Sequence, residues 1–163
     1  MAMSIARSIA AARATLMRRH RMAGAIVLDY VRTRDMNRAA DWLKQAERDL
    51  QVAENSAATG HHEWAAFAAH QCAEKAVKAL VQSLHGSVRG HGITEILRSV
   101  PSSVVVPEEV MEAAGELDRV YLTSRHPNGF VVGSPGDYFS EGSSKRYIAW
   151  SGTILEFCRS QIH

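Results

Sequence analysis

A regular spacing of small and apolar side chains between residues 37 and 58 constrains the fold more than any other feature of the sequence. Steps of four and three residues place such side chains on one face of an α-helix, as in a helix packed within a bundle. Thr59-Gly60 ends this helix, because glycine readily adopts the left-handed conformation that follows a helix C-terminus. The positions that share the spacing are Ala39, Leu43, Ala46, Leu50, Ala53 and Ala57.

Three further long helices and one short helix are predicted downstream. The segment 62–84 is rich in alanine, which lets neighbouring helices approach closely. Pro107, followed by two glutamates, is typical of a helix start, and Pro127 prevents that helix from continuing. The predicted ranges are 62–84, 93–99 for the short helix, 107–125 and 144–161. The predicted fold class is therefore all-α: an antiparallel up-and-down bundle of four long helices plus a short helix, with an N-terminal helical extension.

The segment 126–144 is predicted to be irregular, since it contains four glycines and two prolines. A loop of this length inside a compact domain is usually functional or mobile. The chain of 163 residues, 46% of them apolar, is long enough for one domain with a substantial core. It contains no apolar run long enough for a transmembrane helix, so no membrane association is expected.

The cysteine pattern gives no sign of a disulfide framework or a zinc ribbon. Cys72 and Cys158 lie far apart, and neither belongs to a CxxC motif. We interpret both as small buried apolar residues in a protein of the reducing cytoplasm. The run His61-His62-Glu63 lacks a third ligand at a suitable spacing, so no metal is predicted. No cofactor is predicted either, because the sequence has no Walker or dinucleotide-binding motif.

Residues 1–35 differ in composition from the rest of the chain. They contain seven arginines against only Asp29 and Asp35, whereas the net charge of the whole chain is +2. A basic patch for duplex DNA is therefore not indicated in the remainder. Three interpretations remain: a transit-like segment, an upstream start codon preceding Met36, or an appended helix. We favour the appended helix, which gives a basic extension over 1–35 and a bundle over 36–163.

The sequence contains the segments ADWLKQAERDL at 40–50, QCAEKAVKAL at 71–80, HGITEIL at 91–97 and YLTSRHP at 121–127. In this order, the four segments resemble those of the HEPN family (higher eukaryotes and prokaryotes nucleotide-binding domain). Gly92 stands where the family usually has Asp, and His126 stands where it usually has Tyr. The resemblance covers about residues 37–162 and leaves 1–35 uncovered.

This resemblance implies a helical bundle that commonly forms dimers. Family members occur beside small nucleotidyltransferases, often as toxin–antitoxin pairs, and some act as ribonucleases or bind nucleotides. The expected function is that of a homodimeric, cytoplasmic, nucleotide- or RNA-associated binding module with a nucleotidyltransferase partner. We do not expect an independent enzyme, and any activity would be that of a ribonuclease.

A stripe of polar side chains on the 62–84 helix is the first candidate binding surface. Gln71, Lys75 and Lys78 share one face, and Glu74 lies one turn before Lys78. The lysines could receive a phosphate as mobile point charges. Alternatively, they belong to an ion-pair network that orders the bundle, with their aliphatic stems packed on alanines.

Two segments outside this helix add candidate ligand-binding residues. Arg125 offers a planar guanidinium suited to phosphate, or else it binds the last carbonyls of its helix. Tyr121, one turn earlier, could stack on a base, although a core role is the alternative. His91 begins the short helix, where capping of that helix is the preferred interpretation.

Arg119 and His126 are the candidate catalytic residues of a metal-independent ribonuclease. Histidine supplies an acid or base near neutral pH, and arginine stabilises the charge on phosphorus. The six residues between them match the spacing found in nuclease members of the family. They would share a face only if the helix continued through both, which Pro127 disfavours. A third alternative is a structural dimerisation bundle without a ligand.

Overall fold

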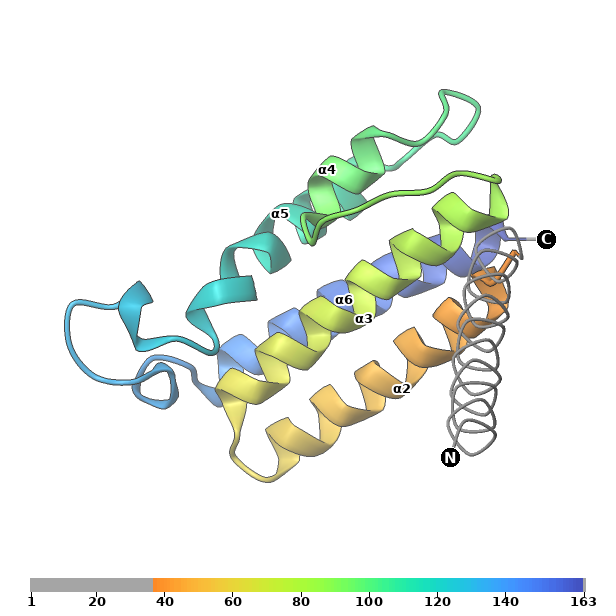
Figure 1. Ribbon diagram of the computed structural model, residues 1–163. Helices are drawn as coiled ribbons and strands as arrows, with labels where there is room; N and C mark the ends of the chain where they lie inside the picture. The colour runs from red at the N-terminus through yellow and green to blue at the C-terminus, as the bar shows by residue number, and fades with distance from the viewer. Residues whose placement is uncertain (1–36, 163) are drawn as a thin grey trace, which may run out of the picture. The chain divides into compact units, whose positions relative to one another are not determined.

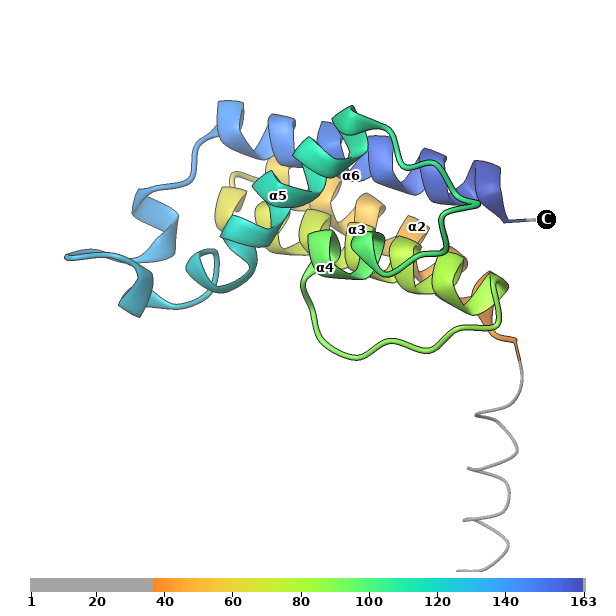
Figure 2. The same cartoon turned by 90° about the horizontal axis from the view of Figure 1, so that it is seen from above.

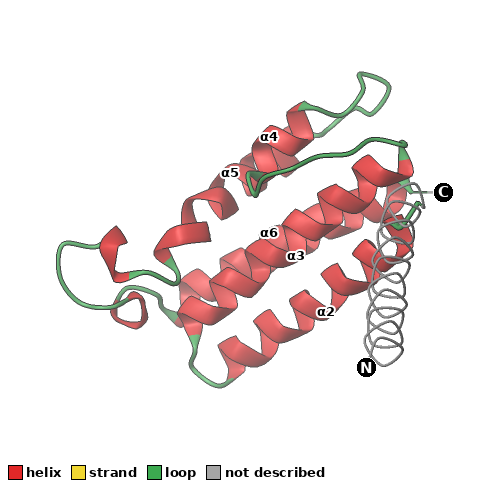
Figure 3. Cartoon of the chain, in the orientation of Figure 1, coloured by secondary structure: helices red, strands yellow, loops and turns green. Residues whose placement is uncertain are grey.

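The computed structural model describes residues 37–162, which fold into a bundle of α-helices (Figure 1). No strand occurs in this part of the chain (Figure 3). The all-α fold and the bundle are therefore confirmed, whereas the predicted helix of residues 1–35 lies outside the described residues. The elements are α2 (Ala39–Ala58), α3 (His62–Ser83), the short α4 (Ile93–Arg98), α5 (Glu108–Thr123) and α6 (Glu141–Gln161), with 3₁₀ turns η1 (Pro127–Gly129) and η2 (Pro135–Asp137).

Helix α3 is the centre of the bundle. α2 and α6 pack along it, and α4 and α5 cover its other side (Figures 1 and 2). Alanines fill much of its buried surface, so the neighbouring helices approach its backbone closely. Leu80, Val77, Leu117 and Ile154 are fully buried in the core that these helices share.

The spacing that predicted the first helix corresponds to its buried face. Ala46 and Ala53 are completely buried, and Leu43 and Leu50 pack against the core from the edge of the same face. Gly60 has φ +81°, as expected for the glycine that follows a helix. The helix therefore stops where the sequence indicated.

The segment between α5 and α6 has more local structure than its glycines and prolines suggested. The rings of Phe130 and Tyr138 stack with centroids 4.0 Å apart. The carboxylate of Asp137 accepts hydrogen bonds from both the backbone N–H and the hydroxyl of Ser134. α6 begins at Glu141, three residues earlier than predicted, because Ser140 caps the helix by accepting a hydrogen bond from the backbone N–H of Ser143.

Cys72 and Cys158 are buried free thiols, as the sequence predicted. Burial raises the pKa of each to about 12, so neither forms a reactive thiolate near neutral pH. Within residues 37–162, no helix has the length and apolar content needed to cross a membrane.

Candidate functional site

Glu74 is the centre of a polar cluster on the face of α3 that lies between α2 and α5. Its residue surface is only 4% exposed. Lys78 Nζ donates to Glu74 Oε1 over 2.7 Å, and Gln71 Nε2 donates to Oε2 over 3.2 Å. His91 Nδ1 lies 3.2 Å from both carboxylate oxygens. Burial alone would raise the pKa of Glu74, but the hydrogen bonds and charges of Lys78 and His91 lower it, which keeps the carboxylate ionised.

His91 connects this carboxylate to the solvent. Its side chain is 56% exposed, and its ring stacks on Tyr121 with centroids 4.9 Å apart. A carboxylate can only accept hydrogen bonds, so Nδ1 carries the proton that faces Glu74. Nε2 is then the ring nitrogen left for a ligand, and the orientation of the imidazole is set by Glu74 and Tyr121 together.

Arg125 contacts the ring of Tyr121, the same ring on which His91 stacks. Its guanidinium carbon is 4.2 Å from the ring centroid of Phe67 and 4.6 Å from that of Tyr121. Nε and Nη2 donate to the backbone oxygen of Tyr121 over 3.1 and 3.0 Å, which is the helix-end contact considered from the sequence. No carboxylate of the described residues lies within ion-pair distance of this half-buried cation.

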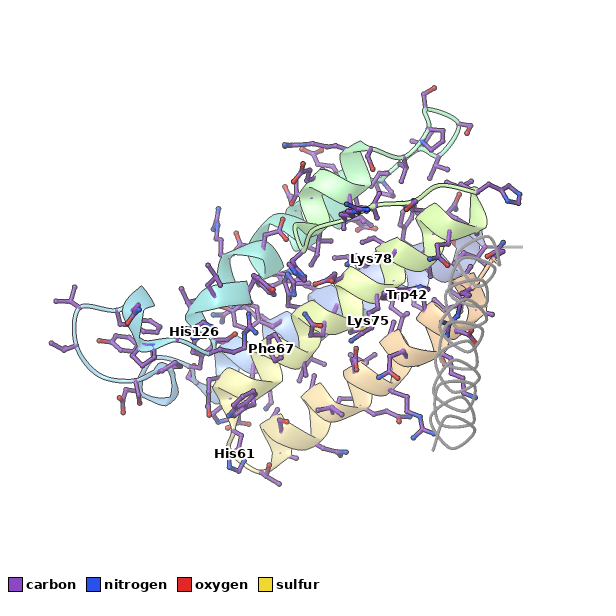
Figure 4. All side chains as sticks on the ribbon, viewed as in Figure 1. Trp42, His61, Phe67, Lys75, Lys78 and His126 are labelled. Carbon is purple, nitrogen blue, oxygen red and sulfur yellow. The ribbon has the colours of Figure 1, made fainter. Side chains whose placement is uncertain are left out.

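These contacts form one continuous row, which we call the α3 ledge (Lys78, Glu74, His91, Tyr121 and Arg125). Figure 4 shows Phe67 toward one end of α3 and Lys78 and Trp42 toward the other. Five of the six ligand-binding residues proposed from the sequence belong to the ledge or contact it: Gln71, Lys78, His91, Tyr121 and Arg125.

The sixth, Lys75, faces α2 and is paired with Asp49. Asp49 also accepts a hydrogen bond from Gln45 Nε2 over 2.9 Å. Both lysines of the predicted stripe therefore have a carboxylate partner, as the ion-pair interpretation expected. An ammonium has three N–H donors, so each lysine retains donors for a second partner. The ammonium of Lys78 also lies 5.7 Å from the ring centroid of Trp42.

The fully buried His70 lies between the ledge residue Glu74 and Asp118 on α5. His70 Nδ1 lies 3.9 Å from Glu74 Oε2, and His70 Nε2 lies 3.8 Å from Asp118 Oδ1. Nε2 has no hydrogen-bond partner among the described residues. Burial would raise the pKa of Asp118, but the nearby His70 and the hydrogen bonds from Thr94 and Ile93 lower it.

The predicted capping of the short helix by His91 is wrong, because Asp118 caps this helix instead. The backbone N–H groups of Ile93 and Thr94 donate to the two Asp118 oxygens over 2.7 and 3.0 Å. Asp118, on α5, therefore caps α4, whereas the side chain of His91 is directed to Glu74. The sequence did not reveal this cap, because its donor and acceptor are about 25 residues apart and belong to different helices.

The proposed ribonuclease pair is not brought together on one helix. α5 ends at Thr123. The backbone N–H of His126 still donates to the Leu122 oxygen over 3.1 Å, but His126 itself has an extended backbone and lies outside the helix. Arg119 is exposed and paired with Glu116 over 2.7 Å. His126 is exposed at the start of η1. The arrangement gives the ribonuclease alternative less support than the ledge gives to ligand binding.

The two histidines at the start of α3 each contact a hydroxyl, His61 within its own turn and His62 on α6. His61 Nδ1 lies 3.1 Å from the Thr59 hydroxyl, and His62 Nδ1 lies 3.0 Å from the Ser144 hydroxyl. In the described part of the chain, no group of three or more His, Cys, Asp or Glu side chains is placed to hold a metal ion.

Comparison with known proteins agrees with this fold. The family model described as "HEPN domain" matches residues 39–161. No curated protein sequence matches the chain.

Solved structures give the same relationship. The protein TT1696 from Thermus thermophilus is 36% identical, with a TM-score of 0.76 over 77% of this chain and 99% of that one. ST0689, described as an archaeal HEPN homologue, is 37% identical, with a TM-score of 0.68 over 78% and 100% of the respective chains. An HEPN domain protein from Thermotoga maritima is 30% identical, with a TM-score of 0.61 over 74% and 95%.

Proposed function

The chain belongs to the HEPN family, and from this membership we propose that it is a homodimeric binding module for nucleotides or RNA. In this proposal it works beside a small nucleotidyltransferase, as in a toxin–antitoxin pair. The α3 ledge is the surface that receives the anionic ligand, and the protein acts by binding rather than as an independent enzyme.

Arg125 is the observation that carries the proposal. A half-buried guanidinium has lost part of its hydration, and burial without a counter-charge is unfavourable unless another group compensates. Phe67 and Tyr121 hold the guanidinium plane, and the Tyr121 carbonyl uses Nε and Nη2. The cation is thus fixed in orientation but has no anion within the described residues. A phosphate oxygen would supply the missing charge at little cost in side-chain entropy.

His91 and Lys78 extend the same surface. Glu74 orients the imidazole of His91 and leaves Nε2 for a ligand, while Lys78 retains N–H donors beyond the one used by Glu74. The paired lysines alone would suit a structural bundle without ligand. Arg125 supports the ligand-binding interpretation, because its helix-end hydrogen bonds to the Tyr121 carbonyl leave its charge without a carboxylate partner in the described residues, unlike the charges of Lys75 and Lys78.

Calorimetric titration with ATP and GTP tests the proposal directly. Wild type is expected to bind, and Lys78→Ala and Arg125→Ala are each expected to weaken binding roughly tenfold or more, since a hydrogen bond to a charged group contributes about 1.5–3 kcal/mol. Lys145→Ala is the matched control, because it removes a lysine from an exposed pair with Glu141 on α6. Unchanged affinity in both ledge variants, or no binding by wild type, would remove the ledge as a ligand site.

A further inference from the structure

A second concave site adjoins the α3 ledge and is not explained by phosphate binding alone. It is a cavity of about 390 Å³ between the beginning of α2 and the middle of α3, within the size range of small-ligand sites. We propose that this cavity binds a guanine base, with the phosphates of the nucleotide directed to Lys75 and Lys78. The inference rests on the proposed function, since it identifies the nucleotide that the ledge would receive. The cavity is lined by Arg38, Asp41, Trp42, Gln45 and Lys75.

Trp42 supplies an aromatic wall for a planar ligand. Its side chain is half-buried and is anchored next to the ledge, with the Lys78 ammonium 5.7 Å from the ring centroid. Stacking on an aromatic side chain is a common way to bind a base, and it tolerates any base because each has a π-face. Trp42 therefore accounts for affinity for a base but not for a choice among bases.

The preferred base depends on the hydrogen-bond acceptors of Gln45 and Asp41 that have no partner among the described residues. Gln45 Nε2 donates to Asp49, and because a carboxylate only accepts, the orientation of the Gln45 amide is fixed with Oε1 as its remaining group. Asp41 Oδ2 accepts from Arg38 Nε over 2.9 Å, which leaves Oδ1 with accepting capacity. Asp41 and Gln45 both line the cavity and lie one turn apart on α2, so each contributes one acceptor on the same side of the helix.

Two acceptors select a base edge that is rich in donors. Guanine presents N1–H and the N2 amino group side by side, so Asp41 Oδ1 and Gln45 Oε1 can each accept one hydrogen bond from it. Adenine presents one amino group beside the acceptor N1, so one of the two contacts would be lost and two acceptors would face each other. Adenine would therefore form one hydrogen bond fewer than guanine and would bring two acceptors together, which favours guanine.

Lys75 and Lys78 are the cations that would bind the phosphates of such a nucleotide. Lys75 lines the cavity itself and is paired with Asp49, while Lys78 lies over Trp42 and is paired with Glu74. Each ammonium keeps N–H donors that these single partners do not use. A guanine nucleotide stacked on Trp42 can therefore extend its phosphates toward both lysines and on to the ledge.

Calorimetry with GTP, ATP and ITP tests this inference on the full-length protein. We expect GTP to bind at least about tenfold more tightly than ATP, and ITP, which lacks the N2 amino group, to bind more weakly than GTP. Trp42→Ala should weaken GTP binding roughly tenfold, as loss of base stacking does. Asp41→Asn should remove the preference for GTP over ATP. Because Asp41 is 64% exposed, this variant is expected to fold normally, and a circular dichroism spectrum confirms it.

The control Val52→Ala trims a side chain that is 53% exposed on α2 and does not line the cavity, and it should leave GTP affinity unchanged. Inorganic tripolyphosphate separates this inference from the proposed function, since it can occupy the ledge but has no base. Binding of tripolyphosphate that depends on Lys78 and Arg125, together with equal GTP and ATP affinity and no effect of Trp42→Ala, would overturn the guanine site and leave the ledge intact. Absence of binding by tripolyphosphate and by every nucleotide would overturn both.

Discussion

At the scale of single residues, the molecule stabilises two carboxylates that burial alone would disfavour. Glu74 faces Lys78, Gln71 and His91, and Asp118 faces two backbone N–H groups at the start of α4. His70 lies between them, within 4 Å of each. The ledge and the cap of α4 thereby share one contact, since both carboxylates lie beside the same buried imidazole.

Asp118→Ala is expected to lower the free energy of unfolding by about 1–3 kcal/mol. The substitution removes an N-terminal cap and leaves the buried N–H of Ile93 without its acceptor. Asp118→Asn keeps one acceptor oxygen and should cost less. Urea unfolding at neutral pH measures the difference, with Glu116→Ala as the control on the same helix, because Glu116 belongs to an exposed pair worth little. Equal stability of Asp118→Ala and Glu116→Ala would show that this cap contributes nothing.

Stability is expected to decrease as the solution is acidified. The folded-state pKa values of Glu74 and Asp118 are lowered from 4.5 and 3.8, so the unfolded chain binds protons before the folded one does. Their contribution is complete above about pH 5 and is lost as the pH falls through the folded-state values. Thermal unfolding between pH 3 and 7 measures this slope. The double variant Glu74→Gln/Asp118→Asn should show a flatter dependence below pH 5, and an unchanged slope would contradict the assignment.

The sequence indicated which residue types could bind a ligand, but it did not indicate which side chains contact each other across different elements. Lys78 and Glu74 could be paired from their spacing, because both lie on one helix. His91 and Arg125 could be proposed as ligand-binding residues from their chemistry, but their contacts to Glu74 and Phe67 cross between elements. His70 and Asp118 gave no periodic signal, since each is one polar residue on a mostly apolar face.

At the scale of elements, two glycines should respond to alanine in opposite directions. Gly60 has φ +81° after α2, so Gly60→Ala should lower the free energy of unfolding by about 1 kcal/mol, and Gly60→Asn by less. Gly152 lies inside α6, and a Cβ there would meet nothing within 4 Å. Gly152→Ala should therefore raise stability by about 0.5–1 kcal/mol. Urea unfolding measures the change in the free energy of unfolding of both variants. A loss of stability in Gly152→Ala would contradict the prediction and would indicate an unrecognised contact on that face of α6.

The helix boundaries show why elements were more predictable than the loops between them. Apolar spacing and helix-stopping residues located all five helices in the described chain to within a few residues. The earlier start of α6 depends on reciprocal hydrogen bonds between Ser140 and Ser143, a capping pair that a glycine-rich context obscured. The local structure of the loop between α5 and α6 depends on the stacked rings of Phe130 and Tyr138. These residues are eight positions apart and belong to no periodic pattern, so the sequence did not predict their contact.

At the scale of the whole molecule, the described residues expose large apolar side chains near the end of α5 and in the loop that follows it. Val131 is fully exposed and Val132 is 72% exposed in the loop after α5, and Leu122 near the end of α5 is 60% exposed. The ring stack of Phe130 and Tyr138 fixes this loop before any partner arrives, which reduces the entropy cost of association. Contiguous apolar surface marks interaction sites, and Val131 and Val132 are neighbours in sequence, so we test this loop as the interface of the proposed homodimer.

If the proposed homodimer uses this loop, Val131→Ser/Val132→Ser should weaken dimerisation at least about tenfold, since a loss of only about 1.4 kcal/mol has that effect. Sedimentation equilibrium over a range of concentrations measures the dissociation constant. For a dimer, the urea midpoint should also rise with protein concentration. Val105→Ser is the matched control, because Val105 is 81% exposed but lies in the linker before α5. The mass of a single chain at every concentration would exclude the homodimer, whereas a dimer unaffected by the double substitution would place its interface on another face.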